Sequence, residues 1–446
     1  MNALPTLPAT PAAREAATSD PVYEDAGRPG QLYARFSGGA RVKVSRGRAR
    51  AYPGLVSEAP PTRPFYEMAA LELAGSRRVL DAGCGAGLGA RLLARSFGEV
   101  VGIDADAEAI EFAVREAPLA AVTCASLERD LPFTGFDGIV AIDVLGHVAD
   151  ALRSVTSLSR TARPEARLFV AEAAAHPTQA LRSPARRAFT PRSLAALLAY
   201  GGFDVESWIT REGSFVALSA RKVDDDATRA VDEAERALAR GDSVGARACL
   251  QRAAGSSRPA LAHEAALAAA DLAFALGDGD DAIRGYFAVR ESGPDDPRPL
   301  TGLSRVSHAI GRHDDAISLA ESATRLDPCD AGAAIALAMA LEEGSIEAAL
   351  PAWRAASRLA PDSLAVASRV AVLAREARVA EVGVAALERV RSYRDPLGAP
   401  LHVELARAYL DAGRTSEARI EAKLAAVAAP TLPDARQLAT QFGIAV

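Results

Sequence analysis

The pattern of apolar and polar residues changes once along this chain, near residue 224. Before that point, short apolar runs alternate with segments whose apolar residues recur at the helical period. The runs occupy residues 79–82, 99–104, 121–124 and 136–142. Such alternation is typical of an α/β fold with a doubly wound, mostly parallel sheet. After the aspartates at 224–226 the chain is rich in Ala, Leu and Arg at the helical period, which predicts an all-helical region.

The first apolar run leads into a glycine-rich turn, Val79-Leu80-Asp81-Ala82-Gly83-Cys84-Gly85-Ala86-Gly87. Glycines at alternating positions let the backbone turn tightly and approach a ligand closely. The dinucleotide pattern G-x-G-x-x-G/A fails from Gly83, because Leu88 stands at its third position, but it is met from Gly85 through Ala90. Spacing alone therefore leaves the cofactor open. Asp81 favours a cofactor that presents a cation, because its carboxylate would repel a pyrophosphate and attract an ammonium.

The motif D-x-G-x-G-x-G at residues 81–87 resembles that of class I S-adenosylmethionine-dependent methyltransferases, in the type 11/12 group. The resemblance implies that Asp81 faces the amino group of the cofactor's methionine part. It also implies that Asp104, at the end of the next apolar run, binds the ribose hydroxyls. Ser126 and Leu127 stand where relatives contact the adenine, often with an Asp. The implied cofactor-binding residues are Asp81, Gly83, Cys84, Gly85, Gly87, Asp104, Ala105, Ser126, Leu127 and Asp143.

Further motifs follow in the order of that family. The run that begins Phe136-Asp137 resembles its fourth-strand signature, and Val144-Leu145-Gly146-His147-Val148 resembles its Leu-Glu-His-Val continuation, with Gly146 in place of Glu. We expect Asp137 to be structural. Thr190 and Pro191 predict the start of a late helix. Residues 214–222 are expected to complete an antiparallel hairpin at the edge of the sheet.

Two histidines are candidates for a general base. His147 follows the fourth strand and His176 follows the fifth, so both are expected at the carboxyl ends of the strands, where open α/β sheets bind ligands. Transfer of an activated sulfonium methyl group needs mainly alignment and a dry pocket. A histidine that only shapes the pocket is therefore the alternative for each. Asp143 is expected to line the cofactor side rather than to act as a base.

The helical region repeats. Prolines at 297, 328, 361, 396 and 430 are separated, by subtraction, by 31, 33, 35 and 34 residues. A period near 34 that closes on a proline resembles tetratricopeptide repeats. We expect five to six helical pairs and a C-terminal cap over residues 227–446, with a concave face for a peptide or protein partner. A purely structural solenoid is the alternative.

The segment before the sheet is expected to have two parts. Residues 1–30 are predicted to be a disordered tail, and residues 31–75 a lid or substrate segment before the methyltransferase domain at 76–222. Within that segment we expect a short helix at 31–36 and a helix at 65–74. A basic cluster between them could meet an acidic substrate, or could be a solvated face. Its members are Arg41, Lys43, Arg46, Arg48 and Arg50.

Composition narrows the functional classes. The net charge of −6 over 446 residues gives no basic footprint for nucleic acid or an anionic membrane, and the four cysteines lack metal-ligand spacing. We expect no metal, no membrane-spanning segment and a cytoplasmic location. The predicted function is methyl transfer from S-adenosylmethionine to a small molecule (EC 2.1.1.-). The alternatives are a protein methyltransferase whose repeats recruit the substrate and a non-catalytic S-adenosylmethionine-binding scaffold.

Overall fold

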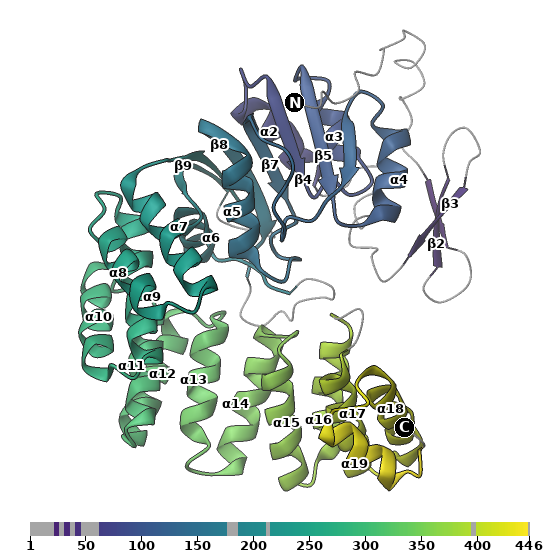
Figure 1. Cartoon of the computed structure of the whole chain (residues 1–446), viewed down its shortest axis with the longest axis vertical. Coiled ribbons are helices and arrows are strands. Elements are labelled where there is room, and N and C mark those ends of the chain that lie inside the picture. The colour runs from purple at the N-terminus through teal and green to yellow at the C-terminus, as the bar shows by residue number, and fades with distance from the viewer. Residues whose placement is uncertain are drawn as a thin grey trace. The chain divides into compact units, whose positions relative to one another are not determined.

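The computed structural model describes residues 62–175, 186–210, 215–393 and 398–444, and the backbone of three strands before them. The chain divides into two compact units (Figure 1). The first contains Met1–Ala174 and Ala188–Arg229, and the second contains Ala175–Arg187 and Ala230–Val446.

The first unit is built on a seven-stranded sheet with the order β6-β5-β4-β7-β8-β10-β9. The five strands from β6 to β8 are mutually parallel, and β10 runs antiparallel to both β8 and β9. The expected parallel sheet with an antiparallel edge hairpin is therefore confirmed. The strands are β4 (Arg78–Ala82), β5 (Glu99–Asp104), β6 (Ala121–Cys124), β7 (Phe136–Ile142), β8 (Ala162–Ala173), β9 (Phe203–Thr210) and β10 (Phe215–Lys222).

Helices cover both faces of this sheet. Leu80 and Ile139 point to one face and pack in a core with α5 (Ala151–Thr161) and α6 (Pro191–Tyr200). Val79 and Val140, their neighbours along the strands, pack in the core on the other face. The helices of that second face are α2 (Arg63–Glu72), α3 (Leu88–Leu93) and α4 (Ala107–Glu116). Burial on both faces explains why these strands are continuous apolar runs rather than alternating ones.

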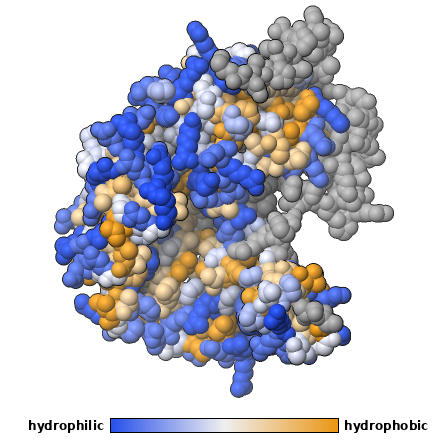
Figure 2. Space-filling view, viewed as in Figure 1, coloured by the Kyte–Doolittle hydropathy of each residue, from blue (hydrophilic) through white to orange (hydrophobic). Residues whose placement is uncertain are grey.

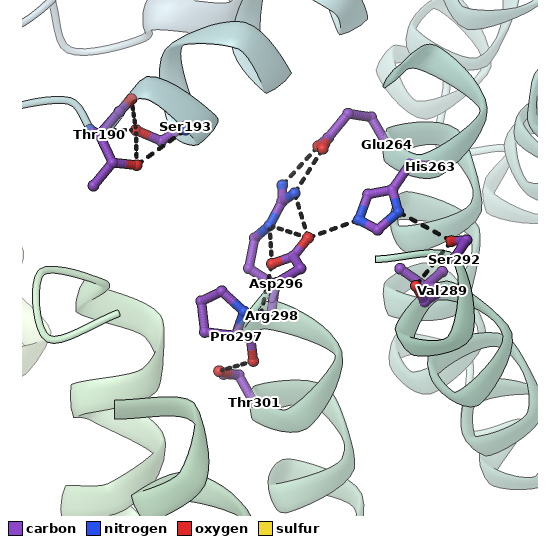
Figure 3. A network of polar contacts seen from close by, with 10 residues as sticks. All are labelled: Thr190, Ser193, His263, Glu264, Val289, Ser292, Asp296, Pro297, Arg298 and Thr301. Carbon is purple, nitrogen blue, oxygen red and sulfur yellow. Dashed lines mark hydrogen bonds and ion pairs between the residues drawn. The ribbon is translucent and has the colours of Figure 1, made fainter. Parts of the chain in front are cut away.

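Two local predictions in this unit are confirmed. Thr190 caps α6: its Oγ1 accepts from the backbone N of Ser193, while Ser193 Oγ accepts from Thr190 N (Figure 3). Asp137 is structural, because its carboxylate accepts from the backbone N atoms of Arg77 and Arg78.

The prediction of a short helix at 31–36 is wrong. A separate three-stranded antiparallel sheet contains β1 (Val22–Asp25), β2 (Gln31–Arg35) and β3 (Arg41–Ser45). The sequence agrees with strands, because apolar and polar residues alternate with period two through Arg41-Val42-Lys43-Val44-Ser45, and Leu32-Tyr33-Ala34 is a short apolar run between polar residues. The predicted disordered tail over 1–30 likewise does not hold for Val22–Asp25. Arg41 and Lys43 of the basic cluster lie on β3, and its other members are outside the described residues.

The described part of the second unit is an array of helices in which, from α8 onward, each helix packs against the next (Figure 1). Alanines occupy the close approaches; Ala282, Ala316 and Ala418 are fully buried. There are six consecutive pairs and a final single helix. Including α7, which begins at the unit boundary, they are α7 (Asp226–Ala239), α8 (Ser243–Ala254), α9 (Pro259–Ala275), α10 (Gly279–Ser292), α11 (Arg298–Ala309), α12 (His313–Leu326), α13 (Ala331–Leu341), α14 (Ile346–Leu359), α15 (Leu364–Glu376), α16 (Ala380–Arg391), α17 (Ala399–Asp411), α18 (Thr415–Ala428) and α19 (Pro433–Gln441).

One short segment from between β8 and α6 belongs to this second unit. Its residue Arg186 forms an ion pair with Asp362 at 2.9 Å and donates to the backbone oxygen of Tyr393, also at 2.9 Å.

Candidate cofactor site

The glycine turn lies at the carboxyl end of β4, and its backbone requires glycine. Gly83, Gly85 and Gly87 have φ of +77°, +52° and +88°. A Cβ on Gly83 would lie 2.5 Å from Val144 Cγ2, and one on Gly87 would lie 2.9 Å from the backbone of Ala113. The turn is also tied to the next strand, because Gly83 N and Cys84 N donate to the oxygen of Ile103 at 2.8 and 2.9 Å. The alternating glycines therefore serve a tight turn packed between two neighbours.

Asp81, two residues before the turn, has a buried carboxylate in which only one oxygen has a hydrogen-bond partner among the described residues. Its Oδ1 accepts from the hydroxyl of Tyr66, on α2, at 3.2 Å. Its Oδ2 is buried and has no hydrogen-bond partner among the described residues. Burial, together with the charge of Asp104, raises the pKa of Asp81 to about 7, while the hydrogen bond from Tyr66 and a weaker contact with the backbone of Ala90 lower it. An ammonium group would provide the missing partner and would favour the charged carboxylate. These residues fit the amino group of S-adenosylmethionine.

Asp104 connects the end of β5 to the same turn. Its Oδ2 accepts from Gly85 N at 3.0 Å, and its Oδ1 accepts from Asp106 N at 2.8 Å. A carboxylate has about four lone-pair sites, so these two bonds are compatible with further hydrogen bonds to a diol. Ala105 follows directly. The structure thus brings Asp81, the glycines and Asp104 together at the carboxyl ends of β4 and β5.

The remaining residues of the predicted set differ in what they offer. Leu127 is buried in the core with α5 and α6, so its side chain is committed to packing. Ser126 Oγ accepts from Glu128 N at 3.2 Å and thereby shapes the loop after β6. Cys84 is buried, and burial raises the pKa of its thiol well above the usual value. Its contribution to the site is therefore its backbone.

The loop after β7 carries two more candidates. Asp143 has φ +55°, which is unusual for a residue with a side chain, and its N donates to Ala171 O at 2.8 Å. His147 Nε2 lies 3.2 Å from Asp143 Oδ1. The two side chains predicted at this strand end are therefore a hydrogen-bonded pair. The other candidate base, His176, is outside the described residues.

Sequence reasoning missed two residues of this site. Tyr66 contacts Asp81 from a helix 15 residues earlier. Glu172, at the end of β8, accepts from the backbone N atoms of Val144, Leu145 and Gly146. Burial and the charge of Asp143 raise the pKa of Glu172 to about 8. The apolar run before Glu172 gave a signal for the strand but none for the carboxyl that ends it.

A second polar cluster lies in the helical array and bears on metal binding. Ligand atoms of His263, Glu264 and Asp296 lie within 4.8 Å of one another. Arg298 takes the place of a cation there: it donates to both oxygens of Glu264 at 2.6 Å and to Asp296 at 2.7 Å (Figure 3). His263 Nε2 lies 2.7 Å from Asp296 Oδ2. Burial raises the pKa of Asp296, but the hydrogen bonds from His263 and Arg298 outweigh it and hold the pKa well below its usual range.

The surface adds one observation. Hydrophilic side chains cover much of the face shown in Figure 2, with apolar residues in separate patches. Within the described ranges, no helix combines the length and the apolar character that a membrane crossing requires.

Part of the chain that contains the site is similar to a known family of domains. Residues 80–170 match the family described as methyltransferase domain. The chain is 31% identical over 170 residues to a probable S-adenosylmethionine-dependent methyltransferase of Mycolicibacterium smegmatis, a match that covers 35% of this chain and 64% of that protein. It is 39% identical over 99 residues to a ubiquinone biosynthesis O-methyltransferase of Mesorhizobium japonicum, covering 21% of this chain and 40% of that one.

Solved structures are also similar to part of the chain. The N-methyltransferase NodS of Bradyrhizobium japonicum, in complex with S-adenosyl-L-homocysteine, is 17% identical with a TM-score of 0.34; the match covers 40% of this chain and 96% of NodS. Magnesium protoporphyrin IX methyltransferase of Synechocystis, with bound S-adenosylmethionine, is 20% identical with a TM-score of 0.30; the match covers 36% of this chain and 78% of that one. The chain spans between 40% and 64% of the curated relatives named above. The predicted cofactor, S-adenosylmethionine, is confirmed by the family match and the curated relatives.

Proposed function

We propose that this chain transfers a methyl group to a small-molecule acceptor, from the premise that residues 80–170 form a methyltransferase domain of the S-adenosylmethionine-dependent class. The observation that carries the proposal is Asp81. A buried carboxylate oxygen without a partner, beside a turn of three left-handed glycines, suits a cationic amino group approaching the backbone closely. When bound, the cofactor supplies a methyl group already activated on sulfur.

The chain's own residues then have separate tasks. Asp81 and Asp104 bind the two ends of the cofactor's polar part. Asp143 and His147 stand at the carboxyl end of β7, where the acceptor enters in this proposal. An uncharged His147 can take a proton from an acceptor hydroxyl or amine, and Asp143 orients its ring through the 3.2 Å contact. A small molecule is favoured because one curated relative is named as a ubiquinone biosynthesis O-methyltransferase.

We further propose that the helical array is a tetratricopeptide solenoid that binds a peptide or protein. The support is its six consecutive helical pairs, its buried alanines and the proline period near 34 residues. If the bound partner is itself the methyl acceptor, the chain is a protein methyltransferase rather than a small-molecule methyltransferase. The test described next separates these two possibilities.

The test has a binding arm and a turnover arm. Calorimetry should show that the full chain binds S-adenosylmethionine and its demethylated product, and that NAD does not compete. Transfer of a labelled methyl group is then measured separately on cell metabolites and on cell proteins. Label in metabolites supports the proposal, and label in proteins alone supports the alternative enzyme. Binding without any transfer would indicate the scaffold, and tight NAD binding without S-adenosylmethionine binding would contradict all three.

A further inference from the structure

Strand β8 ends in a buried carboxyl that the proposed reaction does not use. Glu172 is fully buried, and its two oxygens accept three consecutive backbone N–H groups. Val144 N and Leu145 N donate to Oε1 at 3.0 and 2.7 Å, and Gly146 N donates to Oε2 at 3.0 Å. All three amides belong to the loop after β7. Three donors that converge on this carboxyl group tie the loop to β8, in addition to the turn hydrogen bond that the loop forms itself, from His147 N to Val144 O at 3.0 Å.

The start of that loop needs support. Asp143 holds a left-handed backbone conformation, φ +55°, that L-residues adopt at a cost. Its N–H donates to the oxygen of Ala171, the residue directly before Glu172. Both contacts, to the carboxyl group of Glu172 and to the oxygen of Ala171, therefore come from the last residues of β8. The neighbouring strand imposes a conformation that the loop sequence alone would not favour.

The supported loop lies directly against the cofactor turn. The place that a Cβ of Gly83 would take is 2.5 Å from Val144 Cγ2, so the side chain of Val144 backs the first glycine. Three residues later the same loop carries His147, which contacts Asp143. Displacement of Val144 would loosen the turn from one side, and displacement of His147 would break its pairing with Asp143.

We infer that Glu172 is a positioning residue of the cofactor site, holding residues 143–147 so that Val144 backs Gly83 and His147 pairs with Asp143. The inference rests on the proposed function. A group kept only for stability would be an unusual choice at this position, because burying a carboxyl costs free energy that an apolar side chain would not. The three N–H groups explain its presence, since an apolar residue would leave them without acceptors.

The test uses Glu172→Gln in the full chain. Glutamine keeps the size of the side chain, but its NH₂ group must face at least one of the three N–H donors. We expect amide hydrogen exchange in residues 144–146 to become at least ten-fold faster. The affinity for S-adenosylhomocysteine, measured by calorimetry, should fall at least ten-fold. Glu165→Gln is the matched control, because Glu165 lies on the same strand with its side chain 71% exposed, and both readouts should be unchanged.

Two results would overturn the inference. Unchanged exchange would mean that Glu172 does not hold the loop, and faster exchange with unchanged affinity would mean that the loop does not support the cofactor turn. If Glu172→Gln fails to fold, Val144→Ala leaves the carboxyl and its backbone donors in place; it should weaken binding at least three-fold, and unchanged affinity would again overturn the inference. If the wild-type chain binds no S-adenosylhomocysteine, the proposed function is refuted instead. Slow amide exchange at residues 144–146 of that wild-type chain would show that the loop is held in place and that only the proposed function has failed.

Discussion

At the scale of single residues, the candidate site contains one buried carboxylate, Asp81, that the protein leaves partly unsatisfied. Asp81 has one oxygen bound to Tyr66 and one without a partner among the described residues. Such an atom destabilises the empty protein, because burial disfavours its charge. The same buried charge would stabilise a complex with a cation, because the attraction between opposite charges is stronger away from water. Under the proposed function, Asp81 therefore strengthens cofactor binding and weakens the stability of the empty protein.

We predict that Asp81→Asn weakens binding of S-adenosylhomocysteine by about 10- to 100-fold, because the ammonium loses a charge-assisted hydrogen bond worth about 1.5–3 kcal/mol. The same change should raise the free energy of unfolding of the empty protein at pH 8. Calorimetry and urea unfolding measure the two effects. Asp130→Asn, at a side chain 80% exposed, is the control and should alter neither. Equal affinity in wild type and Asp81→Asn would place the amino group elsewhere.

A second prediction concerns pH. The pKa of Asp81 is raised to about 7 and that of Glu172 to about 8, so between about pH 4 and pH 8 the folded protein holds more protons than the unfolded chain. The free energy of unfolding without cofactor should therefore fall as pH rises through this range, by up to about 9 kcal/mol in total, and then level off.

Urea unfolding can follow the first unit alone. The chain has two tryptophans, Trp208 on β9 and Trp353 on α14, so a Trp353→Phe background leaves a reporter of the first unit. The decrease with pH should be smaller in Asp81→Asn than in wild type. A stability that rises between pH 5.5 and 8 would contradict the stated direction of both pKa shifts.

The residue scale also shows where sequence reasoning ends. Asp81 and the glycines could be predicted, because spacing along one turn records their chemistry. Tyr66 and Glu172 could not be predicted in this way. Tyr66 contacts a residue 15 positions away and Glu172 contacts residues about 27 positions away, so both contacts depend on which helices and strands become neighbours. A single Glu at the end of a strand looks the same in the sequence whether its side chain is exposed to solvent or accepts hydrogen bonds from three backbone N–H groups.

At the scale of elements, local signals were reliable wherever one residue type determined the structure. Thr190 and Pro191 predicted the start of α6, and the capping hydrogen bonds confirm it. Glu165 shows the limit. It occupies a left-handed position, φ +63°, near the start of β8, a conformation that glycine adopts more readily than glutamate. The missed strands β2 and β3 show another limit, since a five-residue run can match either period.

The polar cluster in the helical array permits a prediction at this scale. Arg298→Ala removes the guanidinium that joins Glu264 to the fully buried Asp296. The buried carboxylate of Asp296 then keeps only His263 and the backbone N of residue 298 as hydrogen-bond partners among the described residues. Because it loses its cationic partner, we expect the array to lose about 2–4 kcal/mol of unfolding free energy. Urea unfolding followed by Trp353, in a Trp208→Phe background, is the measurement.

The control for this variant is Arg325→Ala on α12, where the side chain is 67% exposed and the loss should be within about 0.5 kcal/mol. Equal stability of the two variants would mean that the cluster of His263, Glu264, Asp296 and Arg298 contributes nothing measurable.

At the scale of the whole molecule, the two units use different rules of assembly. Every residue assigned here to the cofactor site within the described part of the chain belongs to the first unit. We therefore predict that separating residues 1–225 from residues 226–446 leaves the affinity for S-adenosylhomocysteine unchanged. The second piece should be almost wholly helical by circular dichroism, because each helix pair contacts only its neighbours.

If the array recruits the acceptor, the separated enzyme should lose activity on that acceptor alone. Rejoining the pieces through a longer linker is the control and should restore it. An N-terminal piece that does not fold, or appreciable β structure in the C-terminal piece, would contradict independence of the units.

The strand order of the central sheet has a kinetic consequence. Val79 of β4 pairs with Gly138 of β7, 59 positions later (138 minus 79), so the middle of the sheet cannot form until a long loop has closed. In the array, by contrast, each helix finds its partner immediately along the chain. Folding rates fall as the sequence separation of native contacts grows. The C-terminal helical array is therefore expected to fold faster than the sheet, although it is synthesised later. In a refolding experiment, Trp353 should reach its native fluorescence before Trp208.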